Sequence, residues 1–127
     1  LFYRESRRKP TLAPAAPVPD VDLLKVVAGM TNRLVEASLA SGARGLVLEA
    51  LGRGNVPPAV VPGVRHWTDA GRPVVVASRS SRGRVLDTYA YAGGGQQARV
   101  ELMLALGVHG DDVAAIRDVV EAGRYGA

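Results

Sequence analysis

The chain has 127 residues, 47% of them hydrophobic, which is enough for one domain with a buried core and excludes a disordered chain. It has no apolar run near the roughly 18 residues of a membrane span, no cysteine for disulfide or thiolate chemistry, and only the isolated His66 and His109 as imidazole metal ligands. The net charge is +4, and basic residues gather in two loops, at Arg4, Arg7, Arg8 and Lys9 and at Arg79, Arg82 and Arg84, while the chain has only one Phe, one Trp and four Tyr for base stacking. This indicates solvated loops and argues against a nucleic-acid partner.

Residues 1–20 hold four of the eight prolines and show no periodic apolar face. This composition is typical of an extended connector. The chain opens on Leu1 in the stretch LFYRESRRKP, which is unlike a natural start and suggests a further N-terminal part. We therefore predict a connector over residues 1–20 and one domain over residues 21–127.

Three valine- and leucine-rich stretches after residue 20 predict buried β-strands, namely VDLLKVVAG, ARGLVLEA and RPVVVAS. A helical pattern lies between each consecutive pair, so the predicted order is β-α-β-α-β with short connections. Strands that are apolar on both faces suit a parallel sheet that is covered by helices on each side. We predict an α/β fold with a parallel sheet, in a Rossmann-like or flavodoxin-like three-layer domain.

The two helices between these strands are expected to be amphipathic. In the first, TNRLVEASLASG, one face carries Leu34, Val35, Ser38 and Leu39. The second, PPAVVPGVRHWTDAG, tolerates Pro62 if it lies in the first turn, and Gly71 ends it. Trp67 is expected to pack inward and its neighbour His66 to be exposed.

Two more helical patterns follow the loop after residue 78. The stretch QQARVELMLALG aligns Val100, Met103 and Leu104. The stretch DDVAAIRDVVEAG aligns Val113, Ile116 and Val120. Asp111 or Asp112 is expected to cap the last helix.

Polar residues and glycines follow each predicted strand, at residues 29–31, 52–55 and 78–80. Because the carboxyl ends of parallel strands meet at one edge of the sheet, where ligands bind in such folds, a site or an interface is expected there. Asn55 fits two roles at this edge, since it can cap the helix that begins near Pro57 or contact a ligand. Glu49 and Asp87 have no spacing that supports acid–base work and are expected to be surface or loop carboxylates. No dinucleotide fingerprint, Walker motif or serine-nucleophile elbow accompanies these stretches.

Three stretches resemble, in their order and spacing, the C-terminal domain of bacterial L-asparaginases of the threonine-nucleophile family: ARGLVLEALGRGNVPPAV, GRPVVVASRSSRGRV and QARVELMLALG. The resemblance covers residues 21–123, and its most specific part is the G-x-G-N loop that ends at Asn55. It implies an amidohydrolase that converts L-asparagine, or alternatively L-glutamine, to the acid and ammonia through an acyl-enzyme. The family's nucleophilic threonine lies in an N-terminal domain, and no T-G-G-T motif occurs in this chain, so no catalytic residue is assigned to it.

The resemblance further implies a homo-oligomer, a dimer or a dimer of dimers, with active sites between subunits. In the family, the asparagine of the G-x-G-N loop reaches into the neighbouring subunit's site, which assigns substrate support across the interface to Asn55, with Gly54 and Arg53 beside it. A cytoplasmic enzyme without cofactor, metal, membrane or nucleic-acid partner is expected. Two alternatives stay open: a non-catalytic α/β binding or assembly module, and the matching domain of a tRNA-dependent amidotransferase subunit.

The sequence departs from the family pattern in two places. Arg53 stands where a small or amide residue is common, and it either adds positive charge near an incoming carboxylate or faces solvent. The segment between Gly95 and Gln96 is shorter than usual, so the family's loop acid has no position here.

Overall fold

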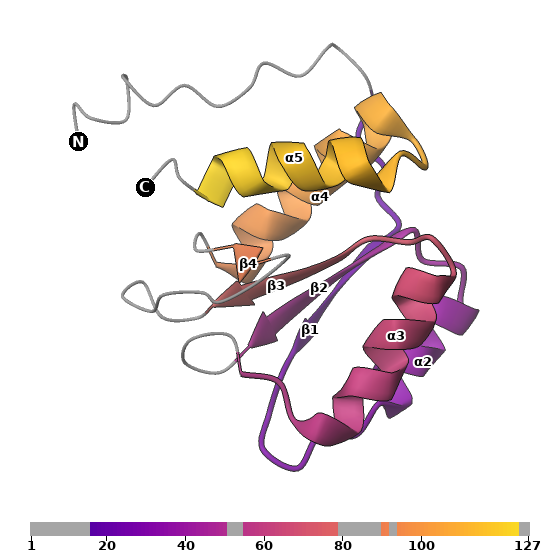
Figure 1. Ribbon diagram of the computed structural model, residues 1–127, viewed down its shortest axis with the longest axis vertical. Helices are drawn as coiled ribbons and strands as arrows, with labels where there is room; N and C mark the ends of the chain where they lie inside the picture. Colours follow the sequence, from indigo (N-terminus) through magenta and orange to yellow (C-terminus); the bar gives the residue numbers. More distant parts are fainter. Residues whose placement is uncertain (1–15, 51–54, 79–89, 92–93, 125–127) are drawn as a thin grey trace, which may run out of the picture.

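The computed structural model describes residues 16–50, 55–78, 90–91 and 94–124. Within them a four-stranded sheet carries helices on both faces (Figure 1). The elements in chain order are β1 (Val21–Lys25), α2 (Arg33–Ala40), β2 (Gly45–Ala50), the 3₁₀ turn η1 (Pro58–Val60), α3 (Val61–Asp69), β3 (Val74–Ser78), β4 (Ala90–Tyr91), α4 (Gly95–His109) and α5 (Val113–Arg124).

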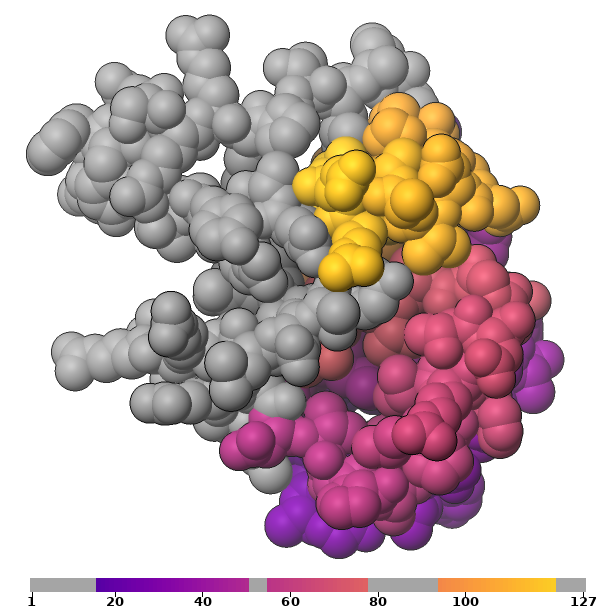
Figure 2. All heavy atoms as spheres, viewed as in Figure 1, coloured from indigo at the N-terminus to yellow at the C-terminus, as the bar shows by residue number. Residues whose placement is uncertain are grey.

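All neighbouring strands in the sheet are parallel, and their spatial order, β1-β2-β3-β4, follows the chain. Helices α2 and α3 contact each other on one face, whereas α4 lies across β1, β2 and β3 on the other face, with α5 beside it. The space-filling view shows the last helices in orange to yellow at the upper right and the segment that contains α3 in pink below them (Figure 2). The predicted α/β fold with a parallel sheet between two helical layers is confirmed.

The alternation of side chains along β2 produces two hydrophobic cores. Leu46 and Leu48 are completely buried on the α2–α3 face, and Val47 is completely buried on the α4–α5 face. Because every residue from Gly45 to Leu48 is buried, β2 reads as a continuous apolar run rather than as an alternating pattern. This central strand thus anchors both layers.

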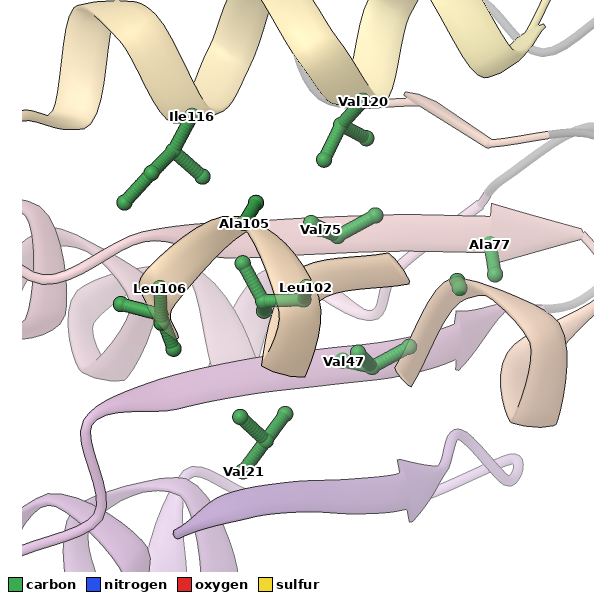
Figure 3. Close-up of a cluster of buried hydrophobic side chains, with 10 residues drawn as sticks. Val21, Val47, Val75, Ala77, Leu102, Ala105, Leu106, Ile116 and Val120 are labelled. Carbon is green, nitrogen blue, oxygen red and sulfur yellow. The ribbon is translucent and has the colours of Figure 1, made fainter. Parts of the chain in front are cut away.

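The core under α4 and α5 is built from small and branched side chains. Figure 3 shows Leu102 and Leu106 of α4 above the strands that carry Val21 and Val47, with Ile116 and Val120 pointing down from α5. The helix sits close to the sheet because Gly45 has no side chain. A Cβ at Gly45 would lie 2.9 Å from Leu102 Cδ2.

On the opposite face, Trp67 of α3 is fully buried and donates a hydrogen bond from Nε1 to the carbonyl of Val35 in α2, at 3.0 Å. Ser38 is also buried, and its hydroxyl donates to the Asp22 carboxylate at 2.5 Å. His66, in contrast, keeps 57% of its side chain exposed and contacts Glu36 at 2.5 Å. The predicted orientations of Trp67 and His66 are confirmed.

Several helix predictions hold. Helix α3 begins at Val61, which places Pro62 in its first turn, where no intrahelical donor is lost. Gly71 follows its end in a left-handed conformation with φ of 71°. Asp112 caps α5, because its Oδ1 accepts a hydrogen bond from the amide of Ala115 at 3.1 Å.

The predicted buried face of α4 is wrong, and that of α2 is wrong at Leu34 only. In α4, Val100 is 52% exposed and Met103 and Leu104 are half-buried, whereas the buried face consists of Ala98, Leu102, Ala105 and Leu106. From Leu102 to Val108 this helix has no polar residue, so the sequence pattern fits more than one buried face, and close packing on the sheet selects the face with the small alanines. In α2, Leu34 is 48% exposed although Val35 and Ser38 beside it are buried.

The described end of the predicted connector, residues 16–20, lies against α4. The amide of Val18 donates to the carbonyl of Met103 at 3.0 Å. Arg99 donates from Nε to the Val21 carbonyl at 2.7 Å and from Nη2 to the Pro19 carbonyl at 3.1 Å. These contacts give the chain a fixed path into β1. The division into a connector over residues 1–20 and a domain over 21–127 stays a prediction.

Candidate functional site

The carboxyl ends of β1 and β2 and the first turn of α4 surround a hollow of about 410 Å³. Its lining residues come from two strand ends and one helix start, and they are Leu23, Lys25, Glu49, Gly94, Gly95, Gln96 and Gln97. The parallel register sets Lys25 directly beside Glu49 on the neighbouring strand. The edge that the sequence predicted for a site therefore carries a hollow with one ammonium and one carboxylate group.

Glu49 and Gly95 determine how close the helix approaches this edge. The Glu49 Oε2 atom lies directly against Gly95, where a Cβ would collide with it, and that Cβ would also lie 2.8 Å from Leu23 Cδ1. Gly94 precedes the helix with a φ of 88°, in the left-handed region that glycine adopts without strain. The two glycines thus let α4 start against the half-buried Glu49.

The hollow can hold groups of both charges. The amides of a helix's first turn lack intrahelical partners and carry partial positive charge, and Gly94 supplies no side-chain cap to α4. These amides and the exposed Lys25 favour a carboxylate group, while Glu49 favours an ammonium group. A small zwitterion has this combination of charges.

Asn55 lies between β2 and η1, and it is exposed. Its predicted role as a helix cap is wrong. The residue that precedes η1 is Pro57, the residue that precedes α3 is Val60, and neither helix start has a side-chain cap hydrogen bond. The 3₁₀ turn moves the start of α3 away from Asn55 in sequence, so the Asn55 side chain does not cap the start of this helix. Gly54 and Arg53 lie outside the described residues.

The other residues predicted at the strand ends have local roles or lie outside the described part of the chain. Gly29 forms a turn with φ of 78°, Met30 is buried, and the Thr31 hydroxyl accepts a hydrogen bond from the Arg33 amide at 3.4 Å. Ser78 ends β3, while residues 79–80 and Asp87 are outside the described residues.

Sequence reasoning missed most of the hollow. Glu49 was expected to be a surface or loop carboxylate, which is wrong, because it lies half-buried within β2. A charged residue inside the apolar run GLVLEA was the available signal. Lys25, Gln96 and Gln97 carried no such signal, because only the register and the packing of α4 bring them together.

Among the described residues, no group of three or more histidine, aspartate or glutamate side chains is placed to hold a metal ion. No helix in this part of the chain combines the length and apolarity that a membrane crossing requires.

Comparisons with known proteins agree on one domain type. Residues 20–120 match the family described as the glutaminase/asparaginase C-terminal domain. An L-asparaginase of Bacillus licheniformis is 34% identical over 77 residues, which cover 61% of this chain and 24% of that protein. A probable L-asparaginase of Deinococcus radiodurans is 37% identical over 94 residues, or 74% of this chain and 28% of that protein.

A second group of relatives has a name that points to a different activity. A glutamyl-tRNA(Gln) amidotransferase subunit of Pyrobaculum aerophilum is 42% identical over 74 residues, which cover 58% of this chain and 18% of that protein. In each of these three comparisons the chain spans less than a third of its relative's length.

Proposed function

The chain belongs to the glutaminase/asparaginase C-terminal domain family, and we propose that it acts as the C-terminal part of an L-asparaginase-type amidohydrolase. The complete protein would convert L-asparagine and water to L-aspartate and ammonia. The nucleophile would come from another part of that protein, since no T-G-G-T motif occurs in this chain. The contribution of this domain is then to hold the subunits together and to support the substrate.

The exposed side chain of Asn55 is the observation that carries this proposal. It lies at the carboxyl edge of a parallel sheet, where ligands bind in such folds, and no helix start uses it as a cap. An amide group both donates and accepts hydrogen bonds, so Asn55 suits a substrate that carries an amide and a carboxylate. We infer that it serves the active site of a neighbouring subunit, with Gly54 and Arg53 beside it.

The assembly and the location are part of the same proposal. A residue that serves a neighbour's site requires a symmetric oligomer, either a dimer or a dimer of dimers such as a homotetramer. The enzyme would be cytoplasmic. L-Glutamine is the second substrate that the family relationship supports.

The similarity to the amidotransferase protein of Pyrobaculum aerophilum supports a second candidate, the matching domain of a tRNA-dependent amidotransferase. A non-catalytic α/β binding or assembly module is the third. The fate of the amide nitrogen separates the three. Ammonia release from L-asparagine without tRNA supports the amidohydrolase, and transfer of the amide nitrogen from the donor amino acid to a charged tRNA supports the amidotransferase. Absence of both release and transfer contradicts both enzyme candidates.

Substitution of Asn55 in the complete protein tests the role of this side chain. We expect Asn55→Ala to lower kcat/KM about tenfold or more, since loss of roughly 1.4 kcal/mol of transition-state stabilisation has that effect. Because Asn55 caps no helix, the free energy of unfolding should change by less than about 0.5 kcal/mol.

Asn55→Asp is the matched variant, because it keeps the shape and an acceptor oxygen but removes the amide donor. We expect it to lose activity as Asn55→Ala does. Normal kcat/KM in Asn55→Asp, measured on a correctly assembled oligomer, would exclude the donor role. A loss of stability without a kinetic defect in Asn55→Ala would return Asn55 to a structural role.

A further inference from the structure

A second hollow, of about 260 Å³, lies at the amino edge of the sheet, opposite the edge that carries Asn55. Arg44 directly precedes β2, and Arg72 and Pro73 directly precede β3. The turn between α4 and α5 closes the hollow with Gly110 and Asp111. The function proposed above does not use this hollow.

Arg72 is a partly buried cation that is fixed in position. Its Nη1 donates to the carbonyl of Leu39 at 3.2 Å and to the carbonyl of Ala43 at 2.9 Å. No carboxylate among the described residues pairs with it. Removing a charge from water is costly unless a counter-charge is present, and two carbonyl dipoles compensate only in part. The guanidinium therefore favours an anion in the adjoining hollow.

Arg44 supplies a second guanidinium, and its present partner is weakly held. Its Nη2 lies 3.6 Å from Asp111 Oδ1, and the two side chains are 40% and 96% exposed. Ion pairs in such an exposed setting contribute little stability because water and salt screen them. An anion from solution can therefore replace Asp111 at small cost. The two arginines and Asp111 leave a net charge of +1 on the lining.

We propose that this hollow binds a small dianion, held between Arg44 and Arg72. The planar, forked guanidinium matches the oxygen atoms of a phosphate or a carboxylate, and two such groups suit either one phosphate or a short dicarboxylate. The volume is slightly below that of hollows that take drug-sized ligands, which favours a small anion. The hollow lies at the opposite end of the strands from the candidate substrate edge, so it constitutes a separate site.

Isothermal titration calorimetry of the chain with inorganic phosphate and, separately, with succinate tests the proposal. Sodium chloride keeps the ionic strength constant in each titration. We expect saturable binding of at least one probe. The probe that binds with the higher affinity shows whether the natural ligand is a phosphate or a dicarboxylate. Absence of saturable binding for both probes would overturn the proposal.

Two single substitutions locate the binding. Arg44→Gln should weaken the affinity about tenfold, which corresponds to the loss of one charge-assisted contact. Asp111→Asn removes the competing carboxylate and should tighten binding, an effect that a folding defect cannot imitate. Arg65→Gln is the matched control, since it removes one exposed arginine of α3 away from the hollow and should leave the affinity unchanged. Equal affinities in Arg44→Gln, Arg65→Gln and the unsubstituted chain would overturn the proposal.

Discussion

Trp67 joins the two helices on one face of the sheet through both its volume and its hydrogen bond. Its ring is completely buried among the α2–α3 core residues, and Nε1 donates to Val35. We expect Trp67→Phe to lower the free energy of unfolding by about 1–3 kcal/mol, because it leaves a void and removes this donor. Urea unfolding followed by circular dichroism measures the change without relying on tryptophan fluorescence.

The neighbouring His66 provides the control for Trp67→Phe. It lies on the same helix, but its side chain is 57% exposed and its contact with Glu36 is at the surface. His66→Gln should therefore change stability by about 0.5 kcal/mol or less. Equal effects of the two substitutions would show that burial of Trp67 does not determine the packing of α2 on α3.

At the level of elements, the start of α5 depends on one of two adjacent aspartates. Asp112 accepts the hydrogen bond from the Ala115 amide, whereas the Asp111 side chain is 96% exposed and makes a long contact with Arg44. Asp112→Ala should cost about 1 kcal/mol, the usual effect of losing a helix cap. Asp111→Ala should cost less than about 0.5 kcal/mol. Chemical unfolding of both variants checks the difference, and the reverse order would show that the cap is assigned to the wrong residue.

The connector and α4 meet at Gly107. A Cβ at this position would collide with the carbonyl oxygen of Ala16. In an unobstructed helix, replacing glycine with alanine stabilises by about 1 kcal/mol. Here the collision must displace residues 16–18, so we expect Gly107→Ala to speed hydrogen exchange of the Val18 amide, which donates to Met103.

Val100→Ala is the matched control for Gly107→Ala. It lies on the same helix, improves helix propensity and is 52% exposed, so it should leave exchange at Val18 unchanged. Unchanged exchange in Gly107→Ala as well would contradict the docked path of residues 16–20.

The sequence predicts an element and its buried face correctly where the hydrophobic pattern fits one arrangement only. The runs around Val47 and Val75 have no polar face, so they predict buried strands, and the large apolar Trp67 beside the polar His66 predicts the inward face of its helix. It was insufficient for α4, where Val100 and Leu102 lie on competing apolar faces and only the space above Gly45 decides between them.

Local sequence patterns also did not predict the two-residue strand β4 or the residue at which α3 begins. A two-residue strand has no periodicity that a pattern could reveal, and its pairing with β3 arises from the whole sheet. At α3, Asn55 before a proline pair is a typical cap signal, but the prolines form a 3₁₀ turn that delays the helix to Val61. The hollow beside Glu49 was hidden for a similar reason, because residues far apart in sequence form it.

At the scale of the whole molecule, the proposal makes a demand on assembly. If Asn55 serves the neighbouring subunit's site, then each active site needs a nucleophile from one subunit and Asn55 from another. A subunit with Asn55→Ala and a subunit whose nucleophilic threonine is replaced should each form poorly active oligomers alone. Mixed oligomers should regain activity, because the intact nucleophile of the first subunit meets the intact Asn55 of the second.

The expected size of this rescue follows from random pairing of equal amounts. About half of the dimers are then mixed, and one of the two sites in each mixed dimer is complete, so activity should return to about a quarter of that of the unsubstituted protein. The measurement is ammonia release after the two variants are unfolded together and refolded, with each variant refolded alone as the control. If Asn55 instead serves the site of its own subunit, no mixed dimer contains a complete site. Activity no higher than the mean of the two variants alone would then exclude the shared site, provided that light scattering shows the oligomers to have re-formed.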